Sequence, residues 1–176
     1  MIPSLVDSTR TMTLTVQHVF LLSLLTALAS ACVSIGVPED DIEKSDTISW
    51  VPPTSPFEEI DNDAVDEAWV NRQNGNLISF RSECGGNDPS LPQIRDSIML
   101  SLDQSELESS SNLEYNGRGA LRSRVKGFVD GIPGQLEILV FKKNRCTYMI
   151  TYNAVSMHFA EDLPVFNRFL NGFKAK

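Results

Sequence analysis

The stretch that decides the fold runs from Arg118 to Ala154 and reads RGALRSRVKGFVDGIPGQLEILVFKKNRCTYMITYNA. Two turn signals, Asp130-Gly131 and Asn144-Arg145, interrupt its apolar runs. Asp-Gly between such runs is typical of a tight hairpin turn. The stretch therefore predicts a meander of three antiparallel strands, over Arg118–Val129, Leu136–Lys143 and Cys146–Ala154.

A second amphipathic pattern follows the meander. Large apolar residues recur there at spacings of 4, 3, 4 and 3, namely Phe159, Leu163, Phe166, Leu170 and Phe173. This spacing places them on one stripe of a helix. The stripe could cover the meander or bind a membrane surface, and the scarcity of basic flanking residues favours packing on the sheet.

Another helix is predicted before the meander. Asp88-Pro89-Ser90 has the composition of a helix start, and Leu91, Ile94, Ile98 and Leu102 form one apolar face over about three turns. The polar segment Ser105 to Asn112 is predicted to be a loop that leads into the meander.

Further upstream, EAWVNR and LISFRSEC flank Gln73-Asn74-Gly75-Asn76. Asn-Gly in this position predicts a hairpin that ends near Cys84. TISW, from Thr47 to Trp50, is a short strand candidate that the following prolines stop. The predicted fold class is therefore α+β, with an antiparallel sheet built from an N-terminal hairpin and a three-stranded meander, and two main amphipathic helices packed on it.

This order of elements resembles the PsbP-like family, which includes the lipoprotein DcrB and the lumenal PsbP proteins of photosystem II. The residues that carry the resemblance are LISFRSEC, Gly119-Ala120, GFVDGIPGQLEILVF, YMITY and the terminal helix from Phe159 to Phe173. The resemblance implies an α/β/α sandwich over residues 47–174. It implies no catalytic residue, because the family is mostly accessory.

The N-terminal 31 residues differ from the rest. Val19 to Leu28 is an uncharged apolar run, too short to span a bilayer and typical of a signal peptide. Ala29-Ser30-Ala31 fits ordinary secretory cleavage; together with Cys32 it also resembles a lipobox, with Ala29 where leucine is usual. A buried core helix is the remaining alternative, and Met12 could be the true start. We expect lipidation of Cys32, followed by an acidic flexible tether over residues 32–46.

Cysteine count supports this interpretation. Without Cys32 as a thiol, the mature chain holds the pair Cys84 and Cys146, which suits an oxidising compartment. Cys84 ends a predicted strand and Cys146 begins one, so both could lie at one edge of the sheet. We expect a disulfide between them, with two buried free thiols as the alternative.

The net charge of −8 is unevenly spread. Residues 33–67 hold 11 acids and one base, a net of −10, while residues 68–176 hold 11 acids and 13 bases, a net of +2. Arg122, Arg124 and Lys126 alternate along one strand and therefore share a face, and Lys142, Lys143 and Arg145 cluster at the next turn. These bases form either a solvated face or a site for an anionic partner, such as a membrane surface.

The sequence contains few candidates for catalytic or metal-binding residues. His158 is the single histidine of the mature chain, at the start of the last helix, where a surface or capping role is expected. The cysteine spacing does not fit zinc, Gly117-Arg118-Gly119 lacks the rest of a dinucleotide loop, and an acidic exported chain does not suit nucleic acid. We expect no catalytic residue, metal or cofactor.

The expected function is a lipid-anchored, non-catalytic protein on the periplasmic side of a bacterial membrane, the outer membrane rather than the inner, whose domain binds or scaffolds an envelope protein. The alternative is an accessory lipoprotein of a transport system that holds a small or lipidic ligand between sheet and helix. An enzyme that uses His158 is the third hypothesis.

Overall fold

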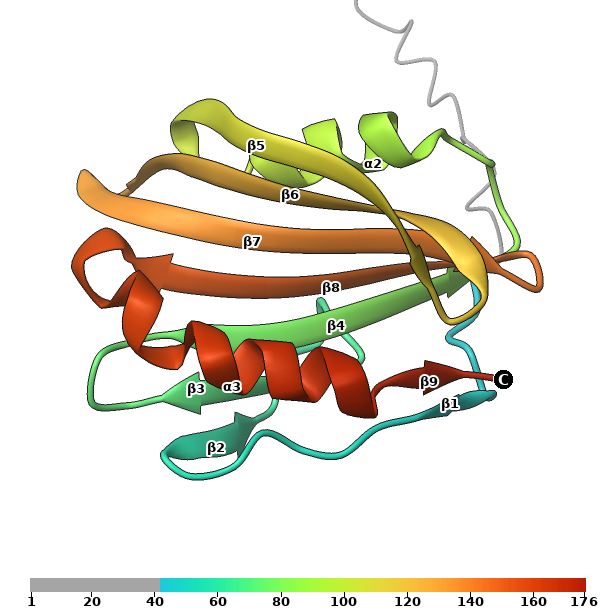
Figure 1. Cartoon of the computed structure of the whole chain (residues 1–176), viewed down its shortest axis with the longest axis horizontal. Coiled ribbons are helices and arrows are strands. Elements are labelled where there is room, and N and C mark those ends of the chain that lie inside the picture. Colours follow the sequence, from blue (N-terminus) through green and yellow to red (C-terminus); the bar gives the residue numbers. More distant parts are fainter. Residues whose placement is uncertain (1–41) are drawn as a thin grey trace, which may run out of the picture. The chain divides into compact units, whose positions relative to one another are not determined.

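The computed structural model describes residues 42–176. A seven-stranded antiparallel sheet carries one helix on each face, and a separate two-stranded ribbon lies beside it (Figure 1). The sheet order is β2-β3-β4-β8-β7-β6-β5. Its strands are β2 (Phe57–Ile60), β3 (Glu67–Asn71), β4 (Leu77–Cys84), β5 (Asp103–Tyr115), β6 (Arg118–Val129), β7 (Ile132–Lys143) and β8 (Cys146–Val155).

The larger core lies between the sheet and α3 (Phe159–Gly172). Phe166 and Phe169 of this helix are buried against the sheet, and Phe173 follows at its end, fully enclosed. Phe80 of β4 stacks with Phe169, with ring centroids 6.4 Å apart. Burial of each such side chain is worth about 1.5–3 kcal/mol, so this helix is held by packing, as its stripe predicted.

The smaller core lies on the opposite face, under α2 (Leu91–Met99). Ser90 caps this helix, since its hydroxyl accepts from the N–H of Gln93 and the Gln93 side chain accepts from the N–H of Ser90. Ile94 is buried on the sheet, and alternate residues of β7 point to the two cores. The three layers confirm the predicted α/β/α arrangement.

The chain enters and leaves the domain at one end of the sheet. Glu43 pairs with Cys84 through two backbone hydrogen bonds. β1 (Ile48–Ser49) pairs with β9 (Lys174–Ala175), which places the C-terminus at the same end (Figure 1). The connections β5–β6 and β7–β8 also lie there, whereas β3–β4, β6–β7 and β8–α3 turn at the other end.

Several predicted boundaries were wrong. The segment Ser105 to Asn112 is not a loop: it belongs to β5, which pairs with β6 along most of its length. Leu102 lies beyond α2, although it is buried in the same core. Folded structure also extends past the predicted limits of 47 and 174, because Glu43 and Ala175 both take part in strand pairing.

The signal peptide, Cys32 and most of the predicted tether lie outside the described residues. Among residues 42–176, no helix has the length and apolar character needed to cross a membrane.

Candidate functional site

Large apolar side chains are exposed at the end of the sheet opposite to the disulfide. Val129 and Ile132 flank the β6–β7 turn, with 50% and 55% of their surfaces exposed. Leu100, at the end of α2, is 83% exposed, and Met157, between β8 and α3, is 79% exposed. Scattered exposed apolar residues are ordinary, but a group at one place marks an interaction surface. We call these four residues the apolar end.

A hollow of about 280 Å³ opens at the apolar end. Its apolar lining comes from four separate parts of the chain, namely Leu77, Leu102, Val129, Ile132, Pro133, Ala154 and Val155. The hollow lies at the surface, and the core between the sheet and α3 is filled by fully buried rings. Within residues 42–176, buried rings thus occupy the space between sheet and helix in which a lipidic ligand was expected.

Local sequence explains why these parts meet. Asp130 and Gly131 both have positive φ, of 51° and 79°, which is the geometry of a two-residue hairpin turn. Gly127 permits the close crossing of the chain after α2: a Cβ on it would lie 2.9 Å from both the Leu102 Cβ and the Asp103 carbonyl oxygen.

The polar residues around the hollow are few. Asp130, Gln135 and Asn153 are its polar side chains, and no histidine, cysteine or lysine lines it. Such a lining can bind apolar groups and orient them through amides, but it holds no pair of groups for acid–base chemistry.

A buried polar network supports the same end of the domain. The Asp162 Oδ2 atom of α3 accepts from the side-chain amides of Asn71, Asn74 and Asn76, at 2.8–2.9 Å. Burial raises the pKa of Asp162, but these hydrogen bonds lower it by more, so its pKa lies below the ordinary value. The three asparagines belong to the β3–β4 hairpin, which the network attaches to the start of α3.

His158 lies at the surface beside this network. Its Nδ1 atom is 2.8 Å from the Glu161 Oε1 atom, and its side chain forms no capping hydrogen bond with α3. The hydrogen bond from His158 is the main cause of a lowered pKa at Glu161. Within residues 42–176, the His158 side chain forms no hydrogen bond with a serine or a cysteine, so it is not paired with a nucleophile there.

Cys84 and Cys146 are joined as a disulfide, with sulfur atoms 2.01 Å apart. The two residues are direct partners in the pairing of β4 with β8. The strand-end positions of these residues therefore led to the correct pairing.

The basic stripe shares one face, as predicted, but its charges are largely neutralised within the chain. Glu137 of β7 accepts from Arg122 Nε at 2.6 Å and from Arg124 Nε at 2.9 Å. Arg124 also stacks over the ring of Phe159, and Lys126 pairs with Glu106. Glu137 is 4% exposed, so the two arginines pair with a buried carboxylate and do not form an open basic surface.

The turn cluster Lys142, Lys143 and Arg145 lies at the disulfide end. With Arg118, these bases line a second hollow of about 280 Å³. Lys142 pairs with Asp88, and Lys143 donates to the Ala175 carbonyl at 2.7 Å. Neither Arg118 nor Arg145 forms an ion pair with any carboxylate of residues 42–176. We call these four residues the basic end.

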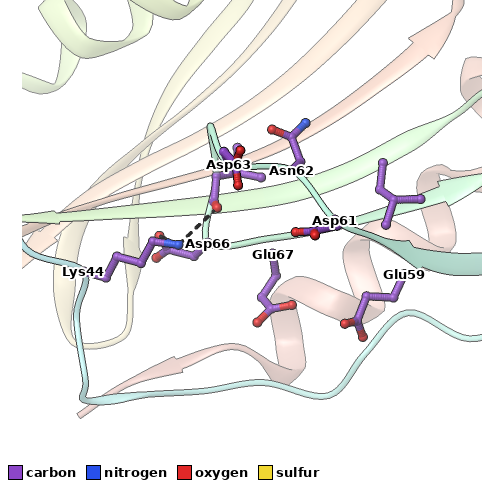
Figure 2. Close-up of a pocket in the computed structure, with 9 residues that line it drawn as sticks. Lys44, Glu59, Asp61, Asn62, Asp63, Asp66 and Glu67 are labelled. Atoms are coloured by element: carbon purple, nitrogen blue, oxygen red, sulfur yellow. Dashed lines mark hydrogen bonds and ion pairs between the residues drawn. The ribbon is translucent and has the colours of Figure 1, made fainter.

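An acidic hollow of about 410 Å³ lies at the β2–β3 connection (Figure 2). Its carboxylates are spread around the rim. Asp66 forms an ion pair with Lys44, with Oδ1 3.7 Å from Nζ, and its Oδ2 atom accepts from the Ser82 hydroxyl at 2.5 Å. Burial and the neighbouring Glu59 raise the pKa of Glu67. Within the described part of the chain, no three histidine, cysteine, aspartate or glutamate side chains converge as metal ligands would.

Comparison with known proteins identifies the fold. No family model matches the chain, and no curated protein matches it. The solved structure of LpqN, involved in cell envelope biogenesis of Mycobacterium tuberculosis, is similar with a TM-score of 0.60 and 10% identity, over 77% of this chain and 90% of LpqN. Cyanobacterial PsbP (CyanoP) from Synechocystis sp. PCC 6803 is similar with a TM-score of 0.54 and 10% identity, over 85% of this chain and 99% of CyanoP. The chain has the PsbP-like fold. At these identities the likeness concerns the fold alone.

The apolar end was missed at the sequence level. Leu100, Val129 and Ile132 have the residue types of a core, and their exposure follows only from the way the connections meet at one end. The sequence signals that could have found it are the apolar residues on both sides of Asp130-Gly131, since a hairpin turn is ordinarily polar.

Proposed function

We propose that this chain is a lipid-anchored, non-catalytic protein of the bacterial envelope whose PsbP-like domain binds another envelope protein. The observation that carries the proposal is the apolar end, where the exposed side chains of Val129 and Ile132 line an apolar hollow and Leu100 and Met157 are exposed on neighbouring connections. Aromatic and aliphatic anchors at a desolvated centre are what protein interfaces use. The involvement of LpqN in cell envelope biogenesis supports a place in the envelope.

The position of the apolar end indicates which partner it meets. Ten residues lie between Cys32 and Glu43, where the chain joins the sheet, and the eleven steps from Cys32 to Glu43 reach about 40 Å when fully extended. The ten-residue strand β8 separates the two ends by about 33 Å. The tether joins the domain at the disulfide end, so when that end stands toward the membrane the apolar end faces away from it, toward a protein rather than its own bilayer.

The test is site-specific photocrosslinking in intact cells, with the crosslinker at Ile132. Val51, 64% exposed and lining no part of the hollow, is the matched control. We expect Ile132 to capture a defined protein and Val51 not to. The double variant V129S/I132S should lose the partner, whereas V51S should retain it. Identical products from both positions would contradict the proposal.

A lipidic ligand is the second candidate, and the apolar lining of the hollow favours it. At about 280 Å³ the hollow is slightly smaller than usual ligand pockets, so it would hold only part of an acyl chain. Lipid extraction from the purified protein distinguishes a lipidic ligand from a protein partner. A lipid that is bound to the wild type but not to V129S/I132S, together with no protein captured from Ile132, would favour the ligand.

We propose the basic end as the surface that binds an anionic partner. Its bases lie where the tether joins the domain, and so on the side that an anchor at Cys32 turns toward the membrane. The variant R118Q/K143Q/R145Q should weaken binding to vesicles that contain phosphatidylglycerol. The control R72Q/R81Q/K126Q removes the same formal charge elsewhere and should bind as the wild type does. An equal loss in both variants would make the effect one of net charge only.

A further inference from the structure

One edge of the sheet is open over an unusual length. β5 is 13 residues long, pairs with β6 on one side, and has no strand partner on the other among residues 42–176 (Figure 1). In an antiparallel pair, alternate residues turn their N–H and C=O groups away from the neighbour. β5 therefore presents a row of unpaired backbone donors and acceptors, which is a template for another strand.

The chain protects its two edges differently. The opposite edge strand, β2, has four residues and follows Pro56, as protected edges do. β5 contains neither proline nor lysine. α2 packs over β6 and β7 and reaches β5 through Arg95, which donates to the Ser110 hydroxyl at 3.3 Å on one face of the strand. Its register is irregular between Asp103 and Ser109, and such irregularity hinders pairing there.

From Ser109 onward this protection ends. The register with β6 is regular from Ser109 to Tyr115. The side chains of Ser109 to Asn112 are small, uncharged and exposed, so a partner backbone can approach them without steric conflict. We define the open segment as Ser109 to Leu113.

The charges of β5 indicate what kind of segment can pair with its open edge. β5 has four acids, Asp103, Glu106, Glu108 and Glu114, and no base. A second copy paired antiparallel about Ser111 would place Glu108 opposite Glu114 twice, and like charges in that position are destabilising. An extended segment with a basic residue at each end would instead meet Glu108 and Glu114 with opposite charges.

We propose that the open segment of β5 receives an extended, uncharged segment of a partner protein with lysine or arginine at its ends, which adds as an eighth strand. The backbone supplies the hydrogen bonds, and the two flanking acids set the preference for basic ends. This surface is separate from the apolar end, so the proposal does not depend on the function proposed above.

The test uses the chain without its predicted signal peptide, three capped heptapeptides and amide hydrogen exchange. The probe is Lys-Thr-Val-Thr-Val-Thr-Lys. A second peptide carries glutamate at both ends, and a third keeps the lysines but has proline in place of both valines, which removes the capacity to pair. We expect the probe to slow the exchange of alternate amides in Ser109 to Leu113. The glutamate peptide should bind about tenfold more weakly, as two like-charge pairs replace two attractive ones.

Variants locate the effect. E108Q/E114Q should remove most of the difference between the lysine and glutamate peptides, while E58Q/E59Q, the same change on the opposite edge, should preserve it. Equal binding of the proline peptide would overturn strand addition in favour of charge alone. Equal binding of the glutamate peptide would overturn the basic partner. Concentration-dependent protection of the same amides without peptide would assign the edge to a second copy.

Discussion

The Oδ2 atom of Asp162 accepts three of the hydrogen bonds that attach the β3–β4 hairpin to the start of α3. Asp162 accepts from three asparagine amides and is 7% exposed. Asn76 contributes further, because its amide also lies 3.0 Å from the Tyr152 hydroxyl. A charged acceptor with several donors in a buried place makes stronger hydrogen bonds than a neutral one. The network therefore fixes one end of the helix that covers the larger core.

Asp162→Asn should destabilise the domain strongly. The amide oxygen of the new asparagine can take the place of Oδ2, but a neutral acceptor makes weaker hydrogen bonds to the three asparagine amides than a carboxylate does, and this loss costs about 1.5–3 kcal/mol. Urea unfolding at pH 7 measures the change. Glu161→Gln, at the neighbouring exposed position, removes a charge that also accepts from Asn74, but at an exposed site; it is the control and should cost much less than Asp162→Asn.

The loss should depend on pH with a defined sign. The native pKa of Asp162 lies below its ordinary value of 3.8, so its ionised form stabilises the fold above that pH. As pH falls below 3.8 toward the native pKa, the wild type loses this contribution and the variant does not. The gap between the two proteins should therefore narrow in acid. A constant gap from pH 7 to strong acid would contradict the role of the charge.

Removal of the disulfide should also be costly. Cys84 and Cys146 are 62 residues apart, and a loop of that length corresponds to about 4 kcal/mol in the chain-entropy model. C84S/C146S should lower the free energy of unfolding by about this amount, and reduced wild type should behave in the same way. Two thiols alkylated without reductant, in protein taken from the periplasm, would show that the bond is absent in the cell.

At the scale of elements, the sequence predicted the helices and strands that bury an apolar stripe and missed the long strand β5 and the short strands β2 and β9. α3 and β8 were recognisable because packing imposes a period on their residues. β5 has no such period: its residues 106 to 112 are all exposed, and it is a strand because β6 offers it a long pairing edge. Pairing with β6 therefore determines the structure of β5, although its local composition predicts a loop.

Gly127→Ala should disturb the start of β5 and the apolar hollow. The added Cβ would lie 2.9 Å from Leu102 Cβ and from a backbone oxygen, and forced overpacking costs about 1–3 kcal/mol. Gly119→Ala, in the same strand, meets nothing within 4 Å and is the matched control. Thermal unfolding should separate the two variants. Equal stability would mean that the chain after α2 is free to move.

The candidate site belongs to the whole molecule. Leu100, Val129, Ile132 and Met157 come from three connections, and no spacing in the sequence relates them. They lie at one end of the sheet because of the strand order and the direction in which each strand runs. Sequence patterns report burial within one element, so a surface made from the ends of several elements had no local signal.

The same geometry gives the domain two different ends. The basic end lies beside Cys84, where the chain joins the sheet, and the apolar end lies a strand length away. With an anchor at Cys32, anionic headgroups would meet the basic end while the apolar end remains free for a protein. An anchor at Cys32 would thus suit the orientation that the two different ends of the domain favour.

The last prediction tests the anchor on which this orientation depends. Cys32→Ala should release the domain from membranes or leave the precursor uncut, because Ala29-Ser30-Ala31 precedes the residue that would carry the lipid. Fractionation of cells and intact mass of the mature chain measure both results. Ser34→Ala, just beyond the cleavage site, is the control and should remain membrane-bound. If the Cys32→Ala protein still matures and still sediments with membranes, the attachment lies elsewhere in the chain. The apolar end would then be the first place to test, since V129S/I132S in that background would release the protein only if this end itself inserts into the bilayer.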